Sequence, residues 1–169
     1  MRKIKILKAI VDFIWWTSII GGTVIFFILI GIIIGIIPVS PNFRYSVSGI
    51  NTESLTLIEQ IILITLNLVN LLIIYCLYLF RQIVHSFNSL KIFDLLIIKN
   101  FNRIGFCLII VGVAYVLNNF LTHIFNSAIH LKLEFGIGIG CISLGLFSII
   151  LSEIFTIAKS AKQENDLTI

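Results

Sequence analysis

Four long apolar stretches dominate the sequence, and they restrict the chain to a narrow class of folds. They cover residues 11–37, 55–80, 101–125 and 134–157 approximately. Each is long enough to cross a hydrocarbon core, which takes about 20 helical residues. The mean hydropathy is +1.11 and only 12% of the residues are charged. We therefore expect an all-α, polytopic membrane protein in which one domain, residues 1–169, forms a four-transmembrane-helix bundle.

Lysine and arginine are distributed very unevenly among the segments that flank these stretches. The N-terminus, the connection 81–100 with the start of the third stretch, and the tail 158–169 carry ten of them, and the other two connections carry two. Positive residues concentrate on the cytoplasmic side of membrane proteins. We therefore expect a multi-pass protein of the cell membrane with both termini in the cytoplasm. The net charge of +4 is explained by basic cytoplasmic segments that are attracted to the anionic lipids of the bilayer. We therefore expect no direct nucleic acid binding.

The cytoplasmic connection 81–100 alternates apolar residues with Ser, Lys, Asp and His. This pattern is typical of short helices that lie along the inner membrane surface, and we predict one or two of them here. The last apolar stretch continues into residues that favour helix as far as Lys162. Its final turns are therefore expected to project into the cytoplasm.

Two glycine motifs are candidates for helix packing. They are Gly31 with Gly35 in the first stretch, and Gly136 with Gly140 in the fourth. Both lie in the outer half of the expected membrane, and small residues at this spacing let helix backbones approach closely. We predict that the first helix packs on the fourth. A homodimer contact between two copies of the chain is the alternative.

Polar side chains inside the apolar stretches are the next candidates. Asn67 and Asn70 share one helix face, and Asn118 and Asn119 lie at a similar depth in the third stretch. The simple interpretation is a set of amide contacts between helices, and the alternative is a polar pocket for a small ligand. Glu153 lies inside the fourth stretch. It is expected either to pair with a basic residue, Arg103 or Arg81, or to have a functional role.

No pattern in the chain predicts catalysis or a cofactor. The three histidines are dispersed without metal-ligand spacing, and the three cysteines all lie inside apolar stretches. No nucleotide loop or Ser-His-Asp arrangement is present. We therefore expect a protein that is not an enzyme and that needs no cofactor or metal.

The end of the chain carries the most specific motif. Phe155 is followed by Ala158, Ala161 and then Glu164, Asn165, Asp166, Leu167, Thr168 and Ile169. This resembles the closing motif of a bacterial four-helix membrane family, domain of unknown function 2975, although the two alanines replace a glycine and a leucine of the family pattern. The middle of the chain is similar to that family as well, at Phe93, at Asn100 and at Arg103 with the two residues that follow it.

The resemblance implies a membrane protein that influences a small cytoplasmic helix-turn-helix regulator. The tail (Glu164 to Ile169) and the connection around Arg81, Phe93, Asn100 and Arg103 are the expected contact surfaces. The tail could bind the partner directly, dock on the connection through Lys91, Lys99 or Arg103, or stay disordered. The alternative function is a small transporter or immunity-type protein that binds an apolar compound or peptide between the helices. A structural subunit of a larger complex is a third.

Overall fold

The computed structural model describes residues 2–34, 36, 57–88, 94–126 and 135–167. Four long helices make up almost all of this: α1 (Arg2–Ile33), α2 (Leu57–Asn88), α3 (Leu95–Asn126) and α4 (Phe135–Leu167). All four are long and apolar enough to cross a membrane. The all-helical class and the number of helices are thus as predicted.

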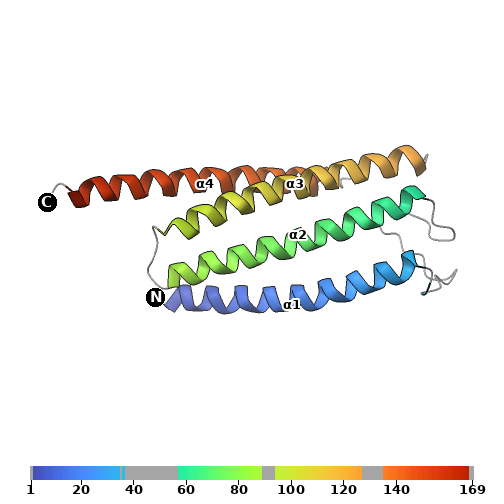
Figure 1. Ribbon diagram of the computed structural model, residues 1–169, viewed down its shortest axis with the longest axis horizontal. Helices are drawn as coiled ribbons and strands as arrows, with labels where there is room; N and C mark the ends of the chain where they lie inside the picture. The colour runs from blue at the N-terminus through green and yellow to red at the C-terminus, as the bar shows by residue number, and fades with distance from the viewer. Residues whose placement is uncertain (1, 35, 37–56, 89–93, 127–134, 168–169) are drawn as a thin grey trace.

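The helices form an open row rather than a closed bundle (Figure 1). Backbone contacts join α1 to α2, α2 to α3 and α3 to α4, and within the described residues none joins α1 to α4. The predicted packing of the first helix on the fourth is therefore wrong. A Cβ built on Gly136 or Gly140 meets nothing within 4 Å. Gly31 lies in α1, and Gly35 lies outside the described residues.

The closest helix pair is α3 with α4, and a different set of glycines makes it possible. A Cβ on Gly112 would lie 2.6 Å from the carbonyl oxygen of Gly138, and one on Gly105 would lie 2.8 Å from that of Gly145. These pairs are spaced by seven residues on each helix. Seven residues is the repeat that keeps one side of a helix on a neighbour in left-handed packing. One repeat further along α4, the Ser152 hydroxyl donates a hydrogen bond of 2.9 Å to the carbonyl of Ile98.

α1 and α3 begin before the starts predicted for them, and α2 continues past its predicted end. In α2 the buried side chains Leu79 and Ile83 continue one face past the first cation, and they pack on Ile97 and Phe101 of α3. That face keeps residues 81–88 helical. The predicted surface helices are therefore wrong, because residues 81–88 belong to α2 and residues 95–100 to α3.

The ends of α1 and α3 have local causes. The Asp94 carboxylate accepts a hydrogen bond of 3.3 Å from the Leu96 N–H, which is an N-cap for α3. α1 already begins at Arg2, because Lys and Arg favour helix and keep their charges exposed. It ends at Ile33, before the predicted residue 37, and the Ile36 N–H closes it on the Gly31 carbonyl at 3.0 Å.

Candidate functional site

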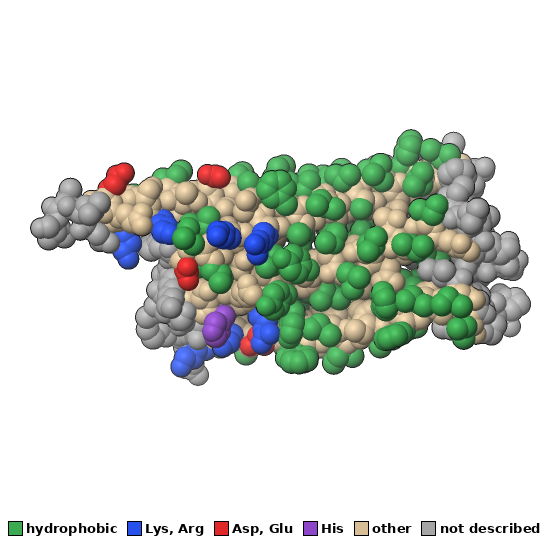
Figure 2. Space-filling model, in the orientation of Figure 1, with side chains coloured by type: hydrophobic (Ala, Val, Ile, Leu, Met, Phe, Trp, Pro, Cys, Tyr) green, Lys and Arg blue, Asp and Glu red, His purple; other side chains and the backbone are tan. Residues whose placement is uncertain are grey.

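Apart from Glu59 near the start of α2, the charged residues of the four helices gather at one end of the row. Residues 13–33, 60–80, 104–126 and 135–152 contain no Lys, Arg, Asp or Glu. These segments lie side by side and form an uncharged belt about 27 to 34 Å long at 1.5 Å per residue. The charged side chains lie beyond it, at the end where the chain begins and ends (Figures 1 and 2). We call this part, residues 2–12, 81–88, 94–103 and 153–167, the charged end.

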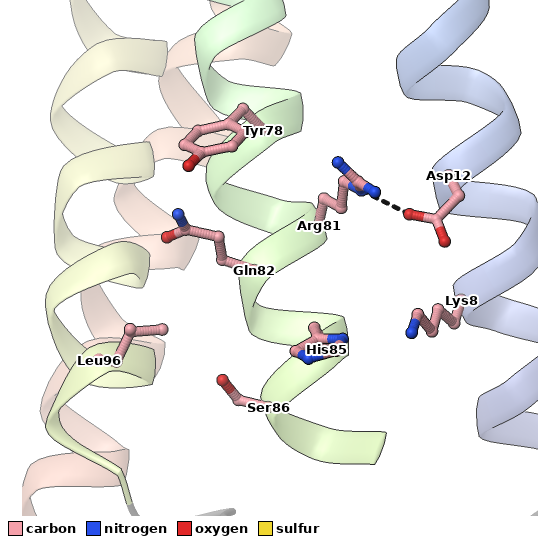
Figure 3. A pocket seen from close by; sticks show the side chains of 8 residues that line it. All are labelled: Lys8, Asp12, Tyr78, Arg81, Gln82, His85, Ser86 and Leu96. Carbon is pink, nitrogen blue, oxygen red and sulfur yellow. Dashed lines mark hydrogen bonds and ion pairs between the residues drawn. The ribbon is translucent and has the colours of Figure 1, made fainter. Parts of the chain in front are cut away.

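A pocket of about 460 Å³ opens between α1 and α2 at the charged end. Its lining comes from α1, α2 and one residue of α3 (Figure 3): Lys8, Asp12, Tyr78, Arg81, Gln82, His85, Ser86 and Leu96. The volume falls in the usual range for small-molecule sites, about 300 to 1,000 Å³. Most of the lining side chains are polar, so the pocket suits a polar or charged group.

Arg81 is the central side chain of this pocket. Its Nε donates a 2.5 Å hydrogen bond to Oδ1 of Asp12, and the two side chains are 35% and 29% exposed. Its guanidinium carbon also lies 4.4 Å from the centre of the Trp15 ring, a cation–π contact. Tyr78 lies against the other side of this cluster, with its ring 6.1 Å from Trp15. The ion pair and the ring contact join α1 to α2 and fix the guanidinium in place.

A second polar link joins α2 to α3. The Asn100 side-chain amide donates a 2.9 Å hydrogen bond to Oε1 of Gln82. Asn100 is almost fully buried, at 3% exposure. Asn100 was predicted as a contact surface for a partner, but its side chain is used inside the protein. Its partner Gln82 lines the pocket, so the link holds one wall of the pocket on α3.

α4 continues well past the other helices. Ser152 faces Ile98, so the first residue of α3, Leu95, is level with Phe155. The remaining helical residues of α4, 156–167, therefore extend about 18 Å beyond the row at 1.5 Å per residue. We call them the α4 extension. Figure 1 shows it projecting beyond the ends of α1, α2 and α3.

The α4 extension contains part of the predicted contact tail. Glu164 and Asn165 are exposed, Asp166 and Leu167 are helical, and Thr168 and Ile169 lie outside the described residues. The predicted docking of Glu164 on Lys99 is wrong, whereas docking on Lys91 or through the Asp166 side chain lies outside the described residues. By the α3–α4 register, Glu164 lies about 20 Å further out than Lys99. Lys91 and Phe93 lie outside the described residues.

The four predicted asparagines are in the belt, away from the pocket. Asn67, Asn118 and Asn119 are buried at 8%, 6% and 3% exposure. Oδ1 of Asn67 and the amide nitrogens of Asn70 and Asn119 are buried without a hydrogen-bond partner among the described residues. The predicted amide contact between helices is therefore incomplete for these atoms.

Glu153 and Arg103 are both exposed at the charged end. The predicted pairing of Glu153 with Arg81 is wrong, since Asp12 binds that guanidinium. Within the described part of the chain, Glu153 forms no ion pair with Arg103 either. Nor do three or more His, Cys, Asp or Glu side chains gather there in a way that could hold a metal ion.

Sequence reasoning overlooked the pocket. It also overlooked the close contact of α3 with α4 at Gly105, Gly112, Gly138 and Gly145, which we call the α3–α4 seam. Asp12 and Arg81 are 69 residues apart, but at the charged end each is the charged residue nearest the belt on its helix. Two neighbouring antiparallel helices place such residues at the same depth. The seam could have been found from the seven-residue spacing of Gly105 with Gly112 and of Gly138 with Gly145.

The comparison with protein families gives one match. The model of the family described as Protein of unknown function (DUF2975) matches residues 19–169. The chain belongs to this family. The match covers all of α2, α3 and α4 and residues 19–33 of α1. Neither the curated proteins nor the solved structures contain a match to the chain.

Proposed function

We propose that this DUF2975 protein is a multi-pass protein of the bacterial cytoplasmic membrane with its charged end in the cytoplasm. The uncharged belt supports this, because its length is close to the roughly 30 Å of a hydrocarbon core. Large apolar side chains are exposed along all four helices, as lipid contact requires. The ten-to-two distribution of Lys and Arg favours the cytoplasm for the charged end.

The proposed activity is binding rather than catalysis. The protein holds a cytoplasmic helix-turn-helix regulator at the membrane and so limits the amount that reaches DNA. The observation that carries this proposal is the α4 extension. It is a helix of about three turns, presented at a fixed place beyond the row, and a partner can contact it from several sides.

The composition of the α4 extension fits a protein partner. Lys159 and Lys162 are followed by Glu164 and Asp166, so the surface has both signs of charge. Ile157 is 66% exposed and offers an apolar contact. An isolated peptide of this length is a marginal helix in water. In this protein the preceding turns of α4 nucleate the helix of the α4 extension. Binding of a partner therefore costs little conformational entropy for ordering it.

Co-purification tests this proposal. The tagged full-length protein is extracted from native membranes in mild detergent, and the proteins that elute with it are identified by mass spectrometry. We expect a helix-turn-helix protein with the full chain and none when residues 163–169 are deleted. The matched control carries the same seven residues in scrambled order, and it should fail as the deletion does. If no such protein elutes with the full chain, or if the deletion keeps it, the regulator proposal is wrong.

The unpaired amide atoms favour one second candidate. Buried polar atoms without partners cost free energy, about 1 to 3 kcal/mol each, and a ligand among the helices would satisfy them. In this alternative the protein is a small transporter or immunity-type protein. Replacing both Asn67 and Asn119 with Leu then removes a resistance phenotype while thermal stability is kept or raised. Loss of stability alone would assign these residues to packing.

A further inference from the structure

We propose that the pocket between α1 and α2 binds the phosphate group of an anionic lipid headgroup. The inference relies on the proposed placement of the charged end at a membrane surface and is independent of any protein partner. It follows from the charges that face the pocket, from the donors that are unused there, and from the depth of the pocket along the helices.

The pocket has more positive than negative charge. Lys8 and Arg81 face it from α1 and α2, and Asp12 is the carboxylate among its lining residues. Asp12 is already paired with Arg81, so the Lys8 ammonium is left uncompensated. His85 lies beside Lys8 in Figure 3 and adds a ring that can donate a hydrogen bond. An anion is therefore the favoured ligand.

The hydrogen-bonding groups of the pocket are mainly donors. Arg81 uses Nε for Asp12, and among the described residues its two terminal nitrogens make no hydrogen bond. The Lys8 ammonium likewise has no partner within that part of the chain. Gln82 accepts through Oε1 from Asn100, and its amide nitrogen makes no hydrogen bond within the described residues. A phosphate has several acceptor oxygens and matches such a set.

The depth of the pocket points to a lipid as the source of this phosphate. Arg81 is the first charged residue beyond the belt on α2, which is the level at which headgroup phosphates lie. Trp15 and Tyr78 are next to it, and such aromatic rings favour the membrane interface. Tyr78, which lies on the belt side of Arg81, also lines the pocket, so the part of a lipid between its phosphate and its acyl chains finds apolar surface there.

Lipid titration of the full-length protein in neutral detergent tests the proposal. Thermal unfolding is measured in about 0.3 M NaCl, where charges more than about 6 Å apart are largely screened. The additions are dioleoyl phosphatidylglycerol, dioleoyl phosphatidylcholine and inorganic phosphate. We expect phosphatidylglycerol to raise Tm in a saturable way, and the other two to have little effect.

Two lysines at nearly the same depth provide the variant and its control. Lys8 lines the pocket, whereas Lys99 is exposed on α3 outside it. We expect Lys8→Gln to weaken the apparent affinity for phosphatidylglycerol at least about fivefold, and Lys8→Arg to restore most of it. Lys99→Gln should change it by less than about twofold, because the charge is screened.

Three outcomes would overturn the proposal. Stabilisation by phosphatidylcholine equal to that by phosphatidylglycerol would show that the negative charge is not recognised. Equal losses in Lys8→Gln and Lys99→Gln would show general attraction to the charged end rather than a site. Equal stabilisation by inorganic phosphate would assign the pocket to a soluble phosphate and refute the lipid source. None of these results depends on the co-purification of a regulator.

Discussion

Replacement of Gly112 by alanine tests the α3–α4 seam. The added Cβ would lie 2.6 Å from the Gly138 carbonyl oxygen and 3.1 Å from the backbone nitrogen of Ile142. Both neighbours are backbone atoms and cannot rotate away. Ordinary contact begins at about 3.4 Å, so the two helices must separate locally by about 0.8 Å, from 2.6 to 3.4 Å.

The cost follows from the contacts that this separation weakens. The full attraction of one pair of atoms in contact is about 0.1 to 0.2 kcal/mol. A gap of 0.5 to 1 Å removes about a quarter to a half of this attraction. If about forty pairs along the seam lose a third of this, the loss is about 2 kcal/mol. Alanine returns up to about 1 kcal/mol through its higher helix propensity. We therefore expect Gly112→Ala to lower the free energy of unfolding by about 1 to 2 kcal/mol.

The assay is SDS-induced unfolding in mild detergent micelles, followed by circular dichroism. Gly140→Ala is the matched control, because its Cβ meets nothing within 4 Å. This control should be neutral or stabilise the protein by up to about 1 kcal/mol. The double variant Gly112→Ala with Gly138→Ala should cost less than the two single costs added, because the helices separate only once. Equal effects of Gly112→Ala and Gly140→Ala would refute the close seam.

Two further predictions concern single contacts between helices. Asp12→Asn and Arg81→Gln are combined in a double-mutant cycle in the same unfolding assay. The coupling free energy between the two substitutions should be about 0.5 to 1 kcal/mol, because both side chains are about a third exposed. A coupling of zero would contradict the ion pair. Ser152→Ala removes the hydrogen bond to α3 and should cost about 1 kcal/mol. Ser148→Ala should cost less than about 0.5 kcal/mol, because that hydroxyl bonds within its own helix; equal costs would contradict the interhelical role of Ser152.

The sequence predicted the elements of this fold better than their ends. Apolar length alone identifies four helices, because a membrane-spanning helix must be apolar around its whole circumference. The end of α2 was misplaced because its first charge, Arg81, was taken as the end of the helix, whereas α4 was predicted to continue to Lys162. In both helices the face that packs on α3 remains apolar past the first charge, at Phe87 and Phe155. The apolar periodicity that continues beyond the first charged residue was the better indication of where a helix ends.

Which helices pack on one another was harder to predict from the sequence. Small residues four apart suggested a contact between the first and fourth helices, but spacing alone does not name a partner. Consecutive helices pack as neighbours more often than helices far apart in sequence, and this is what the row shows. The pocket arises from side chains on three helices, so it could be found only once α1 and α2 had been placed side by side.

The orientation of the charged end is the claim on which both functional proposals depend, and cysteine labelling tests it most directly. Cys76, Cys107 and Cys141 are replaced with Ala, and single cysteines are placed at Gln163 on the α4 extension and at Ile36 beyond the other end of α1. We expect a membrane-impermeant maleimide to label Ile36→Cys in intact bacterial cells, and Gln163→Cys only after the cells are permeabilised. Labelling of Gln163→Cys in intact cells would place the charged end outside and contradict the account.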